Sequence, residues 1–284
     1  MANITPTLKQ VQGQAEQTVR HAAPWVERMA RLGYGAKGIV YIVVGFLAFE
    51  AAFTGGGKTT NSKGALTTIF QQPYGQFLLA IVGIGLAGYA LWRFVEAVLD
   101  SENKGSDPRG IATRLGYVCS GIGYGLLSFT AFQLITGAAQ SATGSAGTQD
   151  WTAKLLSLPF GQVLVGLIGL VVIGSGIGQF VTGYKADFDK QLKLDEIPQA
   201  FRSWAVFSGR WGYMAQGVVF AILGGFIVEA AVHANAQKAK GIGSALDLLA
   251  EQSYGPILLG IVAIGLISYG IFMLVEARYR RIQV

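Results

Sequence analysis

Six stretches of the chain are long enough and apolar enough to cross a membrane as helices. They cover residues 34–53, 74–95, 115–136, 160–182, 211–232 and 255–276. The hydrocarbon core of a bilayer requires about 20 consecutive apolar residues in a helix. Only 13% of all residues are charged and the mean hydropathy is +0.44, whereas a soluble domain carries about 25% charged residues. The sequence therefore predicts an all-α membrane protein with six transmembrane helices.

The chain contains three copies of one two-helix unit, which we term the first, second and third repeats. Each opens with the pattern Arg-x-Gly-Tyr-x-x-x-Gly. The shared positions are Arg31, Gly33, Tyr34, Gly38, Arg114, Gly116, Tyr117, Gly121, Arg210, Gly212, Tyr213 and Gly217. Because each unit crosses the membrane twice, all three point the same way. We therefore expect three parallel repeats in a bundle with pseudo-threefold symmetry about the membrane normal.

The repeats divide the chain into five parts, which are 1–30, 31–100, 114–186, 187–207 and 210–280. The first part is predicted to be a cytoplasmic amphipathic segment that lies on the headgroup layer. The alternative is a polar leader that is partly disordered. The three repeats follow, with an interfacial linker at 187–207 in which a helix is broken by Pro198. Before each second crossing, apolar residues at helical spacing predict a short interfacial helix.

Basic residues gather at one end of the predicted bundle. The N-terminus, the second and fourth connections and the C-terminus hold 17 lysines and arginines, and the other side holds 5. The positive-inside rule therefore predicts that both termini are cytoplasmic. This basic collar favours the anionic headgroups of the lipid bilayer as partners. It does not indicate nucleic-acid binding, because no basic domain stands apart from the membrane.

Polar side chains recur at matching depths of the three repeats. They are an outer layer of Glu50, Gln133 and Glu229 and an inner layer of Glu96, Thr182 and Glu276. Ionisable groups within membrane segments are candidates for ion, proton or ligand binding. All of these positions lie near helix ends, so interfacial anchoring or pairing with arginine and lysine is the favoured interpretation. The spacing does not decide whether the layers face the bundle axis or the headgroups.

Glycine spacing and missing reactive groups argue against a wide pore and against catalysis. Pairs such as Gly121 with Gly125 and Gly174 with Gly178 allow helices to approach closely. The single cysteine, Cys119, lies in an apolar run. No catalytic or metal-ligating constellation emerges, so we expect a protein that is not an enzyme and that has no cofactor and no metal.

The opening pattern, repeated in register, resembles bacterial membrane proteins grouped as domain of unknown function 1206. The stretches "KGALTTIFQQPYGQFLLAIVGIGLAGYALWRFVEAVLD" and "GSDPRGIATRLGYVCSGIGY" are similar to that family's first unit and following linker. The resemblance covers about residues 28 to 280. It implies six crossings of a bacterial cytoplasmic or internal membrane, and it carries no established activity. The second repeat departs most, since Gln133 and Thr182 replace acids and Gln179 replaces Arg93.

Three classes of function remain after these exclusions. The favoured one is a non-enzymatic scaffold or an accessory subunit of a membrane complex, with a membrane protein as its partner. The second is a small-ion or proton pathway through the two polar layers. The third is a lipid-binding protein or a membrane enzyme that acts at headgroup level.

Overall fold

Long helices make up most of this computed structural model, which describes residues 8–54, 59–100, 105, 107–138, 146–186, 188 and 191–282. The long ones are α1 (Leu8–Thr54), α3 (Gly75–Leu99), α4 (Pro108–Ile135), α6 (Gly161–Lys185), α7 (Gln199–Val232) and α9 (Gly255–Tyr279). Each contains one span that is long and apolar enough to cross a membrane, which confirms the six predicted crossings. Helix α1 continues through Pro24. The amphipathic face predicted for residues 1–30 depends mainly on side chains outside the described part.

A short helix precedes each second crossing, as the sequence predicts. These helices are α2 (Ser62–Phe70), α5 (Ala146–Leu156) and α8 (Ile242–Ala250). The glycine that follows each of them is required by a tight turn. A Cβ atom on Gly75, Gly161 or Gly255 would lie only 2.1, 2.2 or 1.8 Å from a backbone oxygen of the short helix. The repeated aromatic-Gly pair therefore marks the point where the chain turns into the membrane.

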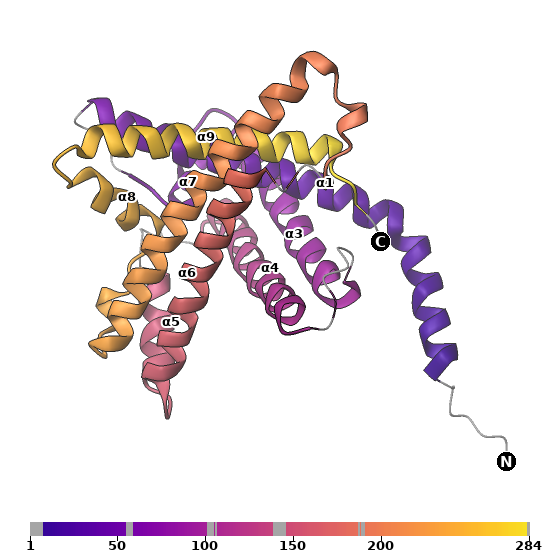
Figure 1. Ribbon diagram of the computed structural model, residues 1–284, viewed down its shortest axis with the longest axis horizontal. Helices are drawn as coiled ribbons and strands as arrows, with labels where there is room; N and C mark the ends of the chain where they lie inside the picture. Colours follow the sequence, from indigo (N-terminus) through magenta and orange to yellow (C-terminus); the bar gives the residue numbers. More distant parts are fainter. Residues whose placement is uncertain are drawn as a thin grey trace.

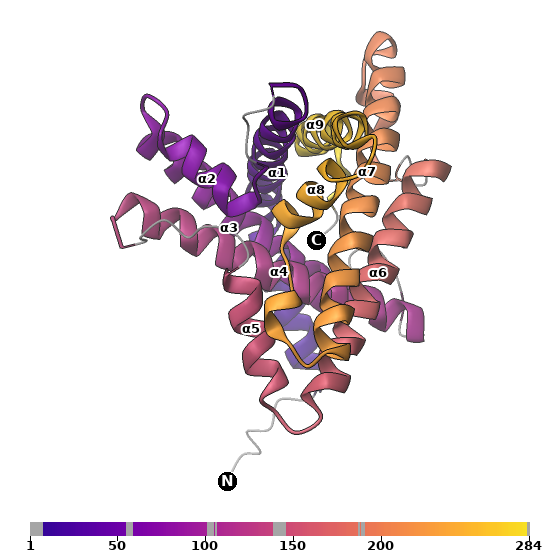
Figure 2. The same ribbon diagram turned by 90° about the vertical axis from the view of Figure 1, so that its left-hand side faces the viewer.

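The six long helices pack as three antiparallel pairs, each joining neighbouring repeats. Figures 1 and 2 show α3 beside α4, α6 beside α7, and α9 beside α1. Each pair joins the second helix of one repeat to the first helix of the next, in cyclic order. Within a repeat, α1 also packs on α3 and α7 on α9. We term the end with the starts of α1, α4 and α7 the inner end, and the opposite end the outer end.

The three pairs are equivalent at the level of single residues. A Cβ atom on Gly38 would meet the carbonyl oxygen of Gly270 at 2.7 Å, and one on Gly217 would meet that of Gly176 at 2.6 Å. In the second repeat, the corresponding Gly121 faces the carbonyl oxygen of Ala90 at 3.2 Å. Small residues thus bring the backbones together at the same height in all three pairs, as expected for helices in lipid.

The pseudo-threefold ring is not confirmed as a whole, because one contact is nearly absent. Helices α4 and α6, which form the second repeat, make no substantial contact within the described residues. The predicted packing role of Gly174 and Gly178 is also wrong, since nothing lies within 4 Å of a Cβ atom at either position. The glycines of α6 that pack closely on α7 are Gly169, Gly176 and Gly183.

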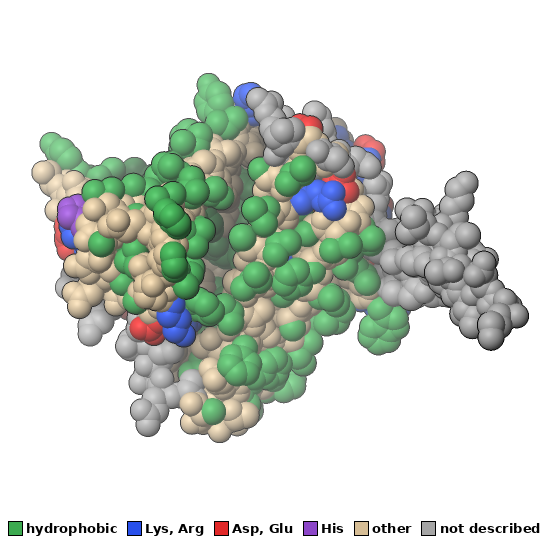
Figure 3. Space-filling view, turned by 90° about the horizontal axis from the view of Figure 1, so that it is seen from below, with side chains coloured by type: hydrophobic (Ala, Val, Ile, Leu, Met, Phe, Trp, Pro, Cys, Tyr) green, Lys and Arg blue, Asp and Glu red, His purple; other side chains and the backbone are tan. Residues whose placement is uncertain are grey.

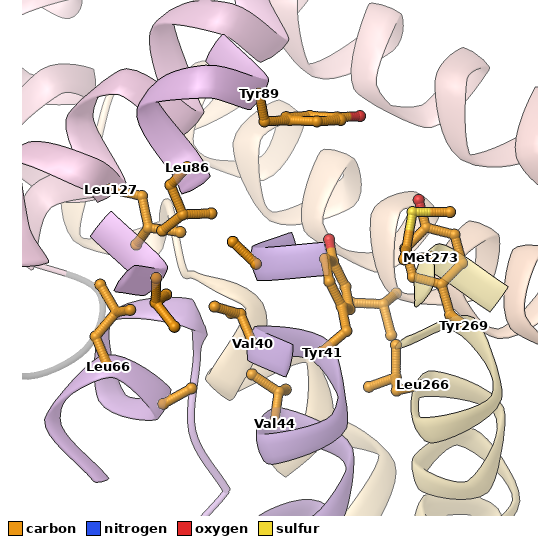
Figure 4. Close-up of a cluster of buried hydrophobic side chains, with 14 of the residues drawn as sticks. Val40, Tyr41, Val44, Leu66, Leu86, Tyr89, Leu127, Leu266, Tyr269 and Met273 are labelled. Carbon is orange, nitrogen blue, oxygen red and sulfur yellow. The ribbon is translucent and has the colours of Figure 1, made fainter. Parts of the chain in front are cut away.

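A hydrophobic core runs through the bundle and reaches its outer end. Figure 4 shows Val40 and Val44 of α1 between residues of α3, α4 and α9, with Leu66 of α2 beside them. Leu66 and its counterpart Leu246 in α8 are fully buried. The short outer helices therefore close the outer end of the bundle. Large hydrophobic side chains also cover much of the surface that faces away from the core, as expected for contact with lipid (Figure 3).

The linker between α6 and α7 differs from the predicted interfacial helix. Its described part includes a short 3-10 helix, Leu194–Glu196, and α7 begins at Gln199 directly after Pro198. Phe188 and Leu192 are buried in the core instead of lying on the membrane surface. Leu192 forms a β-bridge with Arg280, so this linker holds the end of α9. Part of the predicted interfacial segment is thus used for packing, whereas Phe201 and Trp204 at the start of α7 are exposed.

Candidate functional site: a buried charged cluster beside an open second repeat

Lys37 of α1 lies inside the bundle and is only 5% exposed. Its ammonium group donates hydrogen bonds to the phenol oxygens of Tyr269 at 2.8 Å and Tyr89 at 3.1 Å. The rings of Tyr41, Tyr89, Tyr124 and Tyr269 surround the nitrogen at 4.9 to 5.9 Å. Aromatic faces attract cations at such distances. Oxygens and ring faces therefore take the place of water around this lysine.

Four further charged side chains lie beside Lys37: Glu96, Glu276 and Arg280 are buried, and Arg93 is half-buried. Arg93 pairs with Glu96 at 2.7 Å and donates from Nε to the phenol of Tyr89 at 2.8 Å. Arg280 pairs with Glu276 and lies 3.7 Å from Glu96. Together with Lys37 they make a cluster of three cations and two carboxylates, which we term the charged cluster.

The charged cluster ties the first repeat to the third. Lys37 reaches from α1 to Tyr269 on α9, and Arg280, just after α9, reaches Glu96 on α3. Gln216 of α7 donates to the phenol of Tyr41 at 2.9 Å. Because these contacts cross between repeats, separating the helices would expose charges without their partners, at a cost of several kcal/mol each. The cluster can therefore act as a lock.

Several buried polar atoms around the cluster lack a hydrogen-bond partner among the described residues. They are the Tyr34 hydroxyl, the Trp92 indole nitrogen, one Gln216 oxygen and one Glu276 oxygen. Buried polar groups normally have partners, and ordered water often supplies them. No group of three or more potential metal ligands occurs in the described part of the chain.

The structure treats the two predicted polar layers differently. In the inner layer, Glu96 and Glu276 are buried and brought together by Arg280, while Thr182 is half-buried on α6. In the outer layer, Glu50 and Glu229 are exposed and Gln133 is half-buried. Glu229 pairs at 2.8 Å with Lys238, at the end of the short 3-10 helix Ala236–Lys238 that follows α7. Of the six positions, the two inner acids form part of a joint site.

The sequence does not predict the burial of Lys37 and the tyrosines around it, because Lys37 is counted there among the 17 basic residues of the collar. One feature of the sequence nevertheless distinguishes Lys37 from the other basic residues. Lys37 comes six residues after the opening arginine, inside the crossing helix, and the matching positions are Ser120 and Gln216. Tyr89 and Tyr269 also match each other in the second helices of their repeats. A cation among recurring tyrosines at one depth indicates a buried site.

The second repeat is open where the other two are closed. A Cβ atom on Gly33 would lie 2.6 Å from Tyr89, and one on Gly212 would lie 2.5 Å from Tyr269. At the matching Gly116 of α4, nothing lies within 4 Å. The first and second helices therefore touch closely in the first and third repeats and separate in the second. We term the space between the facing sides of α4 and α6 the open seam.

The residues along the open seam are small or exposed. Cys119 is exposed, whereas its counterparts Ala36 and Ala215 pack against Gly85 and Gly265. On α6, the position that matches Tyr89 and Tyr269 is the exposed Ser175, and Gly178 has nothing within 4 Å. The sequence changes and the lost contact thus fall on the same helix faces.

Comparison with known proteins agrees with the threefold repetition. The family described as Domain of Unknown Function (DUF1206) matches residues 32–100, 115–186 and 211–280. The chain is 36% identical over 257 residues to a protein of Bacillus subtilis (strain 168) named "Uncharacterized protein YxxB", covering 90% of this chain and 92% of that protein. No solved structure gives a significant match. This chain therefore belongs to the DUF1206 family and contains that domain three times.

Proposed function

We propose that this integral membrane protein is a non-enzymatic scaffold or accessory subunit that holds a transmembrane helix of a partner protein in the open seam. The observation that carries the proposal is the separation of α4 from α6, where the other two repeats are closed. Small residues occupy these helix faces: Cys119 is exposed, and nothing lies within 4 Å of a Cβ atom on Gly116 or Gly178. In lipid, such faces favour the close approach of another helix.

The closed repeats indicate what kind of surface the open seam is. In the first and third repeats, the same helix faces are used for helix packing, through Gly33 with Tyr89 and Gly212 with Tyr269. An apolar helix with at least one large side chain could make the corresponding contacts with the second repeat. A lipid chain offers no fixed shape to match, so a helix is the occupant that this geometry favours.

The charged cluster supports a static role over a pathway. The alternative, a small-ion or proton pathway, is favoured by the burial of Lys37, Glu96 and Glu276. However, the polar network leads outward into the hydrophobic core around Val44 and Leu66. Tightly paired charges between two repeats provide a rigid base on which a third repeat can hold a partner.

Photocrosslinking inside the cell that naturally makes the protein tests the scaffold proposal. A photoreactive amino acid replaces Cys119 or Ser175 on the seam. The control replaces Ile177 of α6, which is exposed as its counterparts Leu91 and Ile271 are in the closed repeats. We expect a protein adduct of one mass from both seam positions and none from the control. We also expect Gly178→Trp, which fills the seam as Trp92 and Phe272 fill the other repeats, to abolish the adduct. Adducts with lipid alone at Cys119 and Ser175 would contradict the proposal.

We further propose that the protein lies in the bacterial cytoplasmic membrane with both termini in the cytoplasm. The 17-to-5 distribution of basic residues supports this orientation. In a Cys119→Ser background, a cysteine at Lys238 should react with a membrane-impermeant reagent in intact cells. A cysteine at Asp195 should react only after the cells are opened. The reverse pattern would overturn the orientation.

A further inference from the structure

An open groove with a volume of about 460 Å³ runs along the first three turns of α7. It is lined by Gln199, Arg202, Ser203, Val206, Phe207 and Arg210. These residues recur every three or four positions and so lie on one face of the helix. The groove is separate from both the charged cluster and the residues that define the open seam.

The length of α7 places this groove at headgroup depth. Its 34 residues correspond to about 50 Å, whereas the hydrocarbon core is about 30 Å thick. The first turns of the helix must therefore extend beyond the hydrocarbon or lie along its boundary. Exposed aromatic rings occur in the same turns. The ring centre of Phe207 lies 6.4 Å from that of Trp204 and 6.1 Å from that of Trp211. Aromatic residues of this kind gather at the membrane–water interface.

Two arginines give the groove its charge. Arg202 and Arg210 lie two turns apart, and no acidic residue is among the lining residues. Arg202 lies 3.7 Å from Asp195, and one nitrogen of Arg210 donates to the carbonyl oxygen of Tyr184 at 3.1 Å. A guanidinium carries five N–H donors in a planar fork, so each arginine can bind more than one acceptor at the same time. Ser203 and Gln199 add polar groups between water and the apolar part.

From this arrangement we propose that the groove binds one anionic phospholipid. The phosphate is bound by Arg202 and Arg210, which can donate charge-assisted hydrogen bonds to its oxygens. The glycerol part lies against Val206, and the acyl chains pass Phe207 and Trp211 towards the hydrocarbon. Two cations opposite a single phosphodiester favour a lipid whose headgroup carries no cation of its own, such as phosphatidylglycerol.

Native mass spectrometry of the full-length protein, released from detergent micelles, tests this site. The probe is phosphatidylglycerol, compared with phosphatidylcholine of the same chains. We expect a preference for phosphatidylglycerol that falls about tenfold in Arg202→Gln/Arg210→Gln, because each lost hydrogen bond to a charged group weakens binding strongly. The matched control, Lys185→Gln/Arg278→Gln, removes two exposed charges at the same end and should keep the preference.

Three results would overturn the proposal. Equal losses in the two double variants would show a general effect of the basic collar. An equal affinity of the wild-type protein for both lipids would show that the arginines do not select an anion. Displacement of the lipid by soluble glycerophosphoglycerol, at the same concentration as by phosphatidylglycerol, would show a site for a free phosphate ester. Circular dichroism of each variant confirms that it is folded before binding is compared.

Discussion

At the scale of single residues, the burial of Lys37 is the least expected feature. A lysine in a membrane segment is costly unless other groups replace water around its charge. Two phenol oxygens and four aromatic rings do so here. The two carboxylates nearby are held by arginines, Glu96 by Arg93 and Glu276 by Arg280. The cluster therefore satisfies most of its charges internally, which explains how it can remain in a tightly packed bundle.

Removing the charge of Glu96 is expected to destabilise the protein strongly. Glu96→Gln leaves the buried Arg280 and the half-buried Arg93 with less negative charge near them, and the loss of one partner of a buried ion pair costs about 3–5 kcal/mol. The matched control is Glu229→Gln, because Glu229 pairs with Lys238 in an exposed position. Its loss should leave the unfolding midpoint nearly unchanged. Thermal unfolding in one detergent measures both variants. Equal shifts would show that the charged cluster is not a lock.

At the scale of elements, each helix pair depends on small residues at the points where backbones cross. Gly176 of α6 illustrates the requirement, since a Cβ atom there would lie 2.7 Å from both the carbonyl oxygen of Gly217 and the nitrogen of Ala221. Gly174 comes two positions before Gly176 and therefore lies on another side of the helix, where nothing is within 4 Å of a Cβ atom. Two glycines of the same helix thus have opposite roles, and only their positions around the helix distinguish them.

Substitution of these two glycines should give clearly different results. Gly176→Leu forces α6 away from α7 and should destabilise the protein by about 1–3 kcal/mol or more. Gly174→Leu, on the same helix, should leave stability nearly unchanged because its side chain projects into the surroundings. Thermal unfolding of both variants, measured side by side, checks the prediction. A larger effect at Gly174 would mean that α6 faces the other way.

Much of the element pattern could be predicted from the sequence, because it repeats. The six crossings follow from apolar length, and the aromatic-Gly turns at Tyr74 and Phe160 locate the short outer helices. The open seam could not be predicted, because a repeat in sequence suggests equal contacts in all three copies. One difference in the second repeat does correspond to the open seam, because Ser175 replaces the tyrosine found in the other two repeats. Its meaning depends on knowing that the tyrosine faces the partner helix.

At the scale of the whole molecule, the bundle is a ring with one missing contact. Five of the six neighbouring helix contacts in the cyclic order are made among the described residues, and α4 with α6 is the exception. The first and third repeats are tied together by the charged cluster. The second repeat is held by its neighbours instead, α4 by α3 and α6 by α7. This asymmetry is the central claim of the account, because the proposed binding of a partner helix depends on it.

Distances between spin labels across each repeat test this claim most directly. In a Cys119→Ser background, labels are placed at three equivalent pairs of positions, Ile39 with Ile84, Ile122 with Leu170, and Val218 with Ile264. The purified protein is reconstituted in lipid nanodiscs, and electron–electron double resonance gives the three distances. The account predicts similar distances for the first and third pairs and a longer one for Ile122 with Leu170. Three equal distances would show a closed threefold bundle and would contradict it.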